Sequence, residues 1–254
     1  MVVMYMLLDE YSIAEQIMIT KKIAKNEELF IVAKYLRNEI KCDELTTFSI
    51  LDNILSRSKK NYNPAKSAKY VMSVVKKALN NKLKKVDSII VTNNELEIIH
   101  NIENLKLQRL LFSLLVYAKF RNCLSEDNNN WCNININELY KTARVSTRNA
   151  KEKGMLLNKL KNLKLISFSR KNTNLNIRCE FVDNENLEGI IISDLRELGY
   201  QYLALTDKEH FLKCSNCGVT IKRKNKNDYS TKYCNSCLML KNIENKRNSF
   251  LKLD

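Results

Sequence analysis

The chain has 254 residues, enough for one large domain or for two to three small ones. Hydrophobic residues make up 44% of it, but it has only 4 Gly and 1 Pro, which predicts a mostly helical protein and argues against turn-rich β-sandwiches and Gly-rich phosphate loops. Its net charge of +15 favours a polyanionic partner, DNA or RNA, over a charge that serves solubility alone.

The beginning of the chain does not resemble a secretion signal. Met1 to Leu8 is apolar, but it has no basic leader and runs directly into Asp9 and Glu10. No stretch approaches the roughly 20 apolar residues that span a bilayer. We therefore expect no membrane partner and a reducing cytosol, in which paired cysteines favour metal over disulfide.

Residues 1–90 are predicted to form an N-terminal helical domain. Apolar residues recur at helical spacing, as in the runs from Ile13 to Ile23 and from Phe48 to Leu55. Pro64 is expected to open a further helix. This region shows no catalytic constellation, so we expect a scaffold or an interaction module.

Residues 91–183 have the order of elements of a winged helix-turn-helix (α+β). The pattern predicts an apolar helix (95–120), a short strand (131–134), a brief helix (136–143) and a turn at residues 145–146. A longer helix (147–163) capped by Ser146 or Thr147 and two strands (165–168 and 175–182) then follow. In this fold the second helix of the motif enters the major groove of DNA and the hairpin, or wing, reaches the flanking backbone.

The long helix has two chemically different faces. Ala150, Gly154, Leu157 and Leu160 are expected to face inward, whereas the outward face carries cationic side chains. The candidate contacts to nucleic acid are Arg148, Lys151 and Lys159 on the helix and Arg170 and Lys171 at the wing tip. The alternatives are a winged helix that packs only against protein and a lysine-rich face that is merely solvated.

A connector of residues 184–206 is apolar enough to pack, and residues 207–254 then form a zinc-ribbon-like module. Its two CxxC pairs, with sixteen residues between them, predict one tetrahedral zinc site with the ligands Cys214, Cys217, Cys234 and Cys237. Gly218 suits the positive φ that such a turn requires. Four protein ligands leave no open position, so the Zn²⁺ is expected to be structural and to supply stability that this short segment lacks.

The segment between the two cysteine pairs is basic. It is expected to contact phosphates, with Tyr229 or Tyr233 free to stack on a base, and its candidate contacts are Lys222, Arg223, Lys224 and Lys226. A helix is expected after Cys237. A solvated loop on a structural knuckle is an equally good interpretation.

The remaining chemically active side chains are assigned structural roles. The four other cysteines lack metal-ligand spacing and are interpreted as small buried hydrophobes: Cys42, Cys123, Cys132 and Cys179. His100 and His210 are not needed as ligands. Glu95 and Glu97 are interpreted as carboxylates at an ordinary solvated helix start.

Several of these segments together resemble a family of uncharacterised phage and prophage proteins of low-GC Gram-positive bacteria. The similarity extends from about Tyr62 to Cys237. It is carried by these sequences: Asn-Tyr-Asn-Pro at 61–64, Lys-Val-Asp-Ser-Ile-Ile-Val-Thr at 85–92, Leu-Leu-Phe-Ser-Leu-Leu-Val-Tyr-Ala-Lys at 110–119, Asn130-Trp131, Asp-Leu-Arg-Glu-Leu-Gly-Tyr at 194–200 and the CSNCG…YCNSC ending. The resemblance implies a role in phage gene control, replication or counter-defence in a bacterial host cytosol. One departure is Lys164, where winged helices often carry Gly before the wing; a lysine can adopt the left-handed conformation there at modest cost.

Two functions from different classes follow. The first is a sequence-specific regulator that binds DNA in preference to RNA. The second is a counter-defence inhibitor, similar to an anti-CRISPR protein, that docks on a host protein or ribonucleoprotein. We do not expect an enzyme, because the chain has no Gly-rich phosphate loop, no His-Glu-x-x-His pair and no nucleophile beside a histidine. Composition and spacing leave the oligomeric state open.

Overall fold

The structure, a computed structural model, describes residues 7–169, 176–228 and 230–250. These residues form ten α-helices and four two-stranded antiparallel sheets, which confirms the prediction of a mostly helical protein with small sheets. Their contacts divide the chain into two compact units. We call Leu8–Asp87 the N-terminal unit and the part from Ser88 onward the C-terminal unit.

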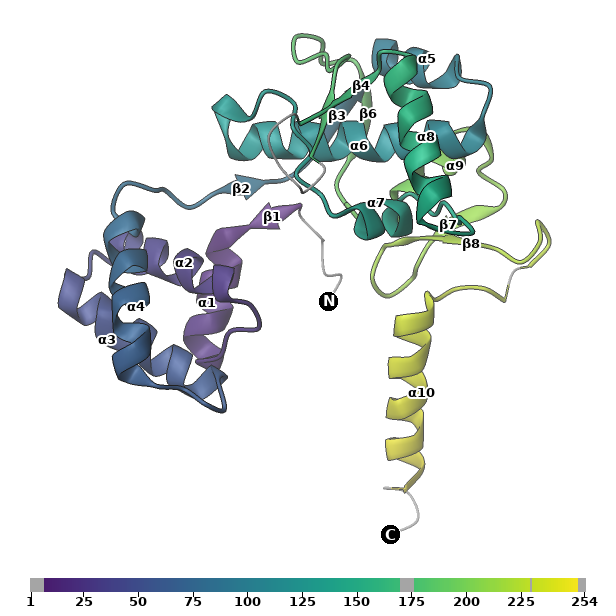
Figure 1. The fold of residues 1–254 in the computed structure, drawn as a ribbon. Coiled ribbons are helices and arrows are strands. Elements are labelled where there is room, and N and C mark those ends of the chain that lie inside the picture. The colour runs from purple at the N-terminus through teal and green to yellow at the C-terminus, as the bar shows by residue number, and fades with distance from the viewer. Residues whose placement is uncertain (1–6, 170–175, 229, 251–254) are drawn as a thin grey trace. The chain divides into compact units, whose positions relative to one another are not determined.

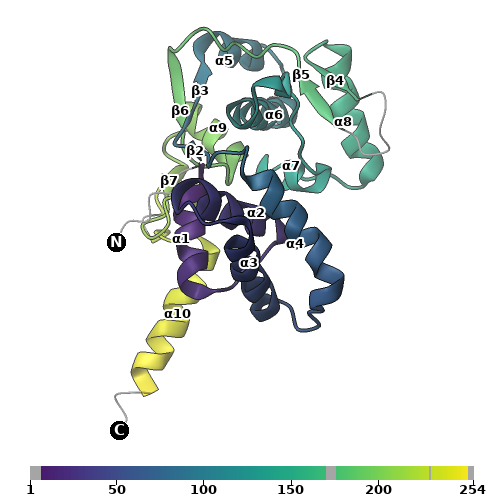
Figure 2. The same cartoon turned by 90° about the vertical axis from the view of Figure 1, so that its left-hand side faces the viewer.

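The N-terminal unit is a bundle of four helices closed by a short β-ribbon (Figures 1 and 2). In chain order its elements are β1 (Leu8–Asp9), α1 (Glu10–Thr20), α2 (Asn26–Lys34) with a π-helical continuation η1 (Tyr35–Glu39), α3 (Glu44–Ser58), α4 (Pro64–Ala78) and β2 (Lys85–Val86). Helix α4 begins at Pro64, as predicted, because its missing N–H would have no partner at that position. The core of this unit consists of apolar side chains that recur at helical spacing, among them Leu29, Leu51 and Val75.

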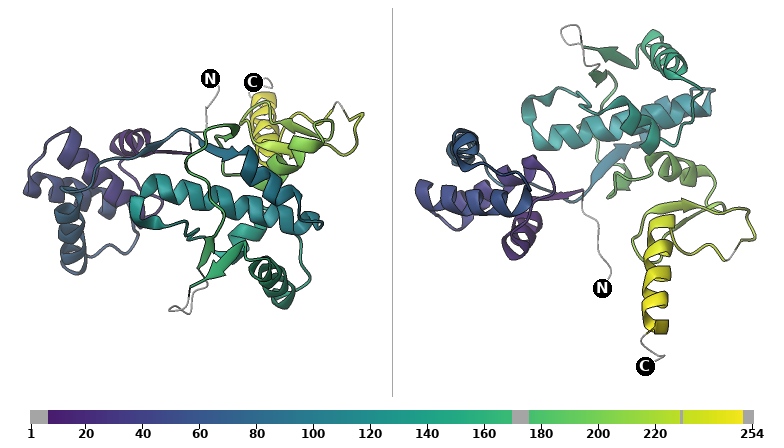
Figure 3. Two further views of the ribbon diagram at one scale, coloured as in Figure 1. Left: turned by 90° about the horizontal axis from the view of Figure 1, so that it is seen from above. Right: turned by 60° about the horizontal axis from the view of Figure 1, so that its bottom comes forward.

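The C-terminal unit is assembled around one long apolar helix, α6 (Figure 3). Its elements are β3 (Ile89–Thr92), α5 (Asn93–His100), α6 (Leu105–Leu124), the 3₁₀ turn η2 (Glu126–Asn128), α7 (Ile136–Thr142), α8 (Ala150–Asn162), β4 (Ile166–Phe168), β5 (Ile177–Cys179), β6 (Gly189–Ile192), α9 (Leu198–Thr206), β7 (Phe211–Lys213), β8 (Thr220–Lys222) and α10 (Asn235–Phe250). Helix α6 is buried on nearly all sides, with Leu110, Phe112 and Leu115 fully enclosed, because α5, α7, α9 and the strands pack around it.

A buried ion pair joins three parts of this unit, and it corrects one expectation. Glu95 is fully buried and not at a solvated helix start, because its carboxylate lies 2.8 Å from the Nζ of Lys119 on α6. The same carboxylate accepts the backbone N–H groups of Thr92 and Asp183, at 2.8 and 2.7 Å. Lys119 also donates to the carbonyls of Ile90 and Asp183. Every donor and acceptor of the pair is thus used, which is what permits its burial.

Helices α7 and α8 are followed by the antiparallel pair β4–β5, and the chain before α7 adds to the other edge of β5. Trp131 forms an isolated β-bridge with Arg178, and Cys132 donates its N–H to the carbonyl of Ile177 at 2.8 Å. Lys164, between α8 and β4, has φ 59°, so it adopts the left-handed conformation expected at that position.

The expected start of α8 is wrong by three residues. Neither Ser146 nor Thr147 caps the helix; instead the Asn149 side chain accepts the N–H of Glu152 at 2.9 Å and the helix begins at Ala150. The inward face also differs: Leu156, Leu157 and Leu160 are buried, whereas Ala150 and Gly154 are exposed. The later start leaves Arg148 in the turn that precedes the helix.

Candidate metal centre and basic surface

The four cysteines of the two CxxC pairs lie together. The Sγ atoms of Cys214, Cys217, Cys234 and Cys237 are all within 4.8 Å of one another, close enough to hold one metal ion. Cys214 and Cys217 flank the turn that joins β7 to β8, and the second pair lies at the start of α10. Gly218 after the first pair has φ 69°, in agreement with the prediction from its position.

Backbone and side-chain N–H groups point at the sulfur atoms, as expected for thiolate ligands. The N–H of Cys234 donates to the Cys214 Sγ at 3.2 Å, and the Asn216 side chain donates to the Cys237 Sγ at 3.3 Å. Burial opposes ionisation of Cys214, but the donors of Cys234, Cys217 and Asn216 outweigh it and lower the pKa of Cys214. Burial raises the pKa values of Cys217 and Cys234, so a bound cation is what would draw their protons off.

The first cysteine pair is anchored to the segment before α9. Arg196 Nη2 donates to the carbonyl of Cys217 at 2.9 Å. The same guanidinium is held by Asp194, with Nη2 to Oδ2 at 2.7 Å, and the Asp194 hydrogen bond raises the pKa of Arg196. Gln201 then donates to the carbonyls of Asp194 and Arg196, both at 2.7 Å. The cysteine module is therefore fixed to α9 by a chain of polar contacts.

Positive charge is concentrated around α8. Between Leu139 and Cys179 the sequence has a single carboxylate, Glu152, against eleven cations: Lys141, Arg144, Arg148, Lys151, Lys153, Lys159, Lys161, Lys164, Arg170, Lys171 and Arg178. Arg148, Lys151 and Lys159 are all exposed. None of these three takes part in an ion pair within the described part of the chain, so no neighbouring carboxylate neutralises their charge at contact distance.

A hollow of about 620 Å³ lies where α8 begins. It is lined by Lys106 at the start of α6 and by residues on either side of the Asn149 cap, including Arg148 and Lys151. Glu152 also lies there and is engaged on both oxygens: it accepts the N–H of Arg148 at 2.6 Å and lies 3.4 Å from the Nζ of Lys106. The backbone N–H of Arg148 lowers the pKa of Glu152, which keeps it ionised.

The basic segment between the cysteine pairs is only partly available. Lys222 and Lys224 are exposed. Arg223 is half-buried and donates to the carbonyls of Glu209 and Lys226, so it holds the hairpin together. Lys226 forms an ion pair of 2.8 Å with Glu209. Tyr233 lies under the ammonium of Lys241, 4.5 Å from the ring centroid, and is not free.

Three of the expected contacts fall outside the described residues: Arg170, Lys171 and Tyr229. Among the other cysteines, Cys132 and Cys179 are fully buried as expected, with their Sγ atoms 3.9 Å apart. Cys42 is half-buried, but Cys123 is exposed, so its interpretation as a buried hydrophobe is wrong. His210 pairs through Nδ1 with Asp207 at 2.6 Å.

Several residues that shape the site gave no local signal in the sequence. Gly199, at the start of α9, lies so close to the turn after α7 that an added Cβ would meet the Ala143 carbonyl oxygen at 2.0 Å. Arg144 of that turn pairs with Glu197 and stacks on Tyr200, with 5.0 Å from its Cζ to the ring centroid. These contacts span more than fifty residues, so only a three-dimensional structure reveals them.

Comparison with known proteins gives no match: no family model, no characterised protein and no solved structure is similar to the chain. Within the described residues, no helix combines the length and the hydropathy needed to cross a bilayer. The resemblance to phage proteins stays a prediction.

Proposed function

We propose that this chain is a DNA-binding regulatory protein in which the region of residues 91–183 is a winged helix and α8 is the recognition helix. The observation that carries the proposal is the concentration of cations on the exposed side of α8, with a single, already engaged carboxylate among them. An α-helix fits the major groove, where such cations meet phosphates and base edges.

The order and pairing of the elements support a winged helix. Helix α6, the Trp131 segment, α7, α8, β4 and β5 follow one another, and β5 lies between β4 and the Trp131 segment. The hollow at the start of α8 is a further place for a backbone phosphate, since three cations, Lys106, Arg148 and Lys151, line it against one carboxylate, Glu152, which is already engaged. We assign no catalytic step to this surface.

The second part of the proposal is that the four cysteines hold a structural Zn²⁺. Four thiolates are the donor set that Zn²⁺ takes in closed tetrahedral sites, and the Sγ cluster fits one ion. Lys222 and Lys224 on β8 and just beyond it would add a second contact to the nucleic-acid backbone.

The test measures DNA affinity as a function of salt concentration. The triple variant Arg148→Gln/Lys151→Gln/Lys159→Gln should bind more weakly, and the slope of log K against log salt should fall by roughly 2 to 3, about 0.9 for each lost phosphate contact. The matched control is Lys66→Gln/Lys69→Gln/Lys77→Gln on α4, which removes the same charge from exposed positions of the N-terminal unit.

Equal slopes in the two triple variants would contradict the role of α8 and indicate attraction by net charge alone. A selection from random duplexes, followed by footprinting, would show whether the binding is sequence-specific. Running the same titration with an RNA duplex of equal length distinguishes DNA from RNA as the partner.

A second candidate function is favoured by α10. Its exposed side chains include four large apolar ones, Leu238, Met239, Leu240 and Ile243, each at least 46% exposed. Such a surface suits docking on a protein, so we propose, as the alternative, an inhibitor or adaptor that binds a host protein or ribonucleoprotein. One stoichiometric partner recovered from host lysate after nuclease treatment would favour it; loss of all partners with nuclease would favour the DNA-binding role.

A further inference from the structure

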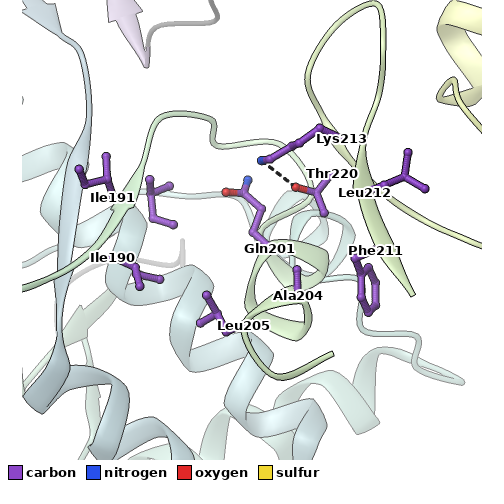
Figure 4. A pocket seen from close by; sticks show the side chains of 10 residues that line it. Ile190, Ile191, Gln201, Ala204, Leu205, Phe211, Leu212, Lys213 and Thr220 are labelled. Atoms are coloured by element: carbon purple, nitrogen blue, oxygen red, sulfur yellow. Dashed lines mark hydrogen bonds between the residues drawn. The ribbon is translucent and has the colours of Figure 1, made fainter. Parts of the chain in front are cut away.

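An apolar hollow lies on the C-terminal unit beside the β7–β8 hairpin that carries the first cysteine pair, but none of the four cysteines lines it. Its volume is about 250 Å³. Figure 4 shows β6 on one side of it, the β7–β8 hairpin on the other and α9 beneath. Ala204 and Leu205 of α9 and Phe211 of β7 provide much of its apolar lining.

The strand β6 that borders the hollow has an unpaired edge. It is hydrogen-bonded to β3 alone, in a two-stranded antiparallel sheet. The N–H of Asn93 donates to the carbonyl of Glu188, which fixes the alternation of the ladder: Ile190 and Ile192 bond to β3, and the N–H and C=O groups of Gly189 and Ile191 point outward. No hydrogen bond to those outward groups occurs in the described part of the chain.

The strand on the opposite side also has a free edge. In the hairpin, Arg223 donates to the carbonyl of His210, and Cys214 donates to that of Val219. By the same alternation, the outward backbone groups of β7 belong to Phe211 and Lys213. The hollow is therefore bordered by two strands that each lack a neighbour on one side.

Two polar side chains converge on the apolar lining. Gln201 is 9% exposed, and its Nε2 donates to the carbonyls of Asp194 and Arg196. Among the described residues, no group donates a hydrogen bond to its Oε1. The ammonium of Lys213 lies in the hollow, 3.0 Å from the Thr220 hydroxyl (Figure 4). In the described lining it is the only charged group; the nearby charges of Asp194 and Arg196 pair with each other at 2.7 Å, so Lys213 leaves the hollow with a net positive charge.

We propose that this hollow binds an extended peptide of a partner protein, which adds as a strand to β6, places an apolar side chain over Ala204 and Leu205 and directs a carboxylate to Lys213. Main-chain pairing gives such complexes their affinity, and the pockets for alternate side chains give them specificity. The side chain of Ile191 on this edge strand is 70% exposed, an unusual state for an isoleucine in a strand, and a docked peptide would cover it. The site is independent of the DNA-binding surface.

The experiment is a titration of the ¹⁵N-labelled, zinc-loaded full chain with a pool of acetylated, amidated pentapeptides Ser-X-X-X-Asp, where X is Val, Ile, Leu or Phe. We expect saturable shifts confined to β6, α9 and β7, and slower hydrogen exchange at the Ile191 amide. N-methylation of the central X should weaken binding about three- to tenfold, because it removes a ladder hydrogen bond. Lys213→Gln should weaken binding of the Asp pool by a similar factor and leave a Ser-X-X-X-Asn pool unaffected.

The control variant is Leu187→Ser, which removes an apolar side chain that is 75% exposed but does not line the hollow. It should bind the pool as the parent chain does. Absence of saturable shifts at millimolar pool concentration would overturn the proposal, as would equal binding of the N-methylated pool. Shifts at the same residues with octanoate but not with peptide would also overturn it and would indicate a site for a small apolar carboxylate.

Discussion

The buried pair of Glu95 and Lys119 allows a sharp prediction about the stability of the C-terminal unit. The two side chains are 1% and 8% exposed, and their neighbours use every remaining donor and acceptor. Glu95→Gln removes the negative charge but leaves the ammonium of Lys119 in place, without a counterion and shielded from water. Breaking a buried pair from one side in this way destabilises proteins by about 3 to 5 kcal/mol.

The measurement is urea unfolding followed by the fluorescence of Trp131, the single tryptophan of the chain, which lies in the same unit. With a slope of about 2 kcal/mol per molar urea, a loss of ~4 kcal/mol lowers the midpoint by about 2 M. The control is Glu180→Gln, which removes the partner of Arg178 from a 3.8 Å pair whose side chains are 41% and 32% exposed. That change should alter the free energy of unfolding by less than about 1 kcal/mol.

The double variant Glu95→Gln/Lys119→Met completes the thermodynamic cycle. Removing both charges should recover a coupling free energy of roughly 1 to 3 kcal/mol relative to the sum of the single changes. Equal, small losses for Glu95→Gln and Glu180→Gln would refute the reasoning, since they would mean that water reaches the ammonium of Lys119 in the folded chain.

Three further predictions concern the candidate metal centre and the helices α8 and α9. Removal of the metal by a strong chelator should abolish the protection of backbone amides from Phe211 to Cys237 against hydrogen exchange. The N-terminal unit should be unchanged. The reason is that binding of a structural Zn²⁺ contributes about 10 kcal/mol or more to the folding of such a module. Gly199→Ala should lower the melting temperature of the C-terminal unit, since its Cβ would meet a backbone oxygen at 2.0 Å, whereas Gly154→Ala, with open space around it, should raise stability by roughly 0.5 to 1 kcal/mol. Asn149→Ala should destabilise α8 by about 1 kcal/mol and Asn149→Asp should not, as seen in amide exchange of the first helical turn.

Features governed by local spacing could be predicted from the sequence. The clustering of four cysteines follows from two CxxC pairs, because each pair presents two thiolates from one turn. The start of α4 at Pro64 and the positive φ of Gly218 follow from the chemistry of those two residues. The positive φ of Lys164 does not, because a lysine adopts that conformation only at a cost; it is expected instead from the position of the residue between the helix and the hairpin. The identity of the ion stays a prediction.

Features that depend on residues far away in the chain could not be predicted from the sequence. Ser146, Thr147 and Asn149 are all good caps, and local chemistry does not rank them; the choice of Asn149 accompanies the contact of Glu152 with Arg148 and with Lys106, some forty residues earlier. Sequence spacing likewise gives no reason to bury a glutamate in the first turn of a helix. The burial of Glu95 depends on its ion pair with Lys119 of α6, the next helix along the chain.

The segment between β6 and α9 connects the two candidate sites through consecutive residues. Arg196 holds the carbonyl of Cys217 in the first cysteine pair, and Glu197 pairs with Arg144 in the turn that precedes α8. Two residues further on, Gly199 brings the start of α9 against the same turn. A rotation of α9 would disturb both ends of this segment at once, so the cysteine module and the turn that precedes α8 depend on the same short stretch of chain. We propose that a Zn²⁺ held by the four cysteines would steady this segment and, through Glu197 and Arg144, the turn that leads into α8.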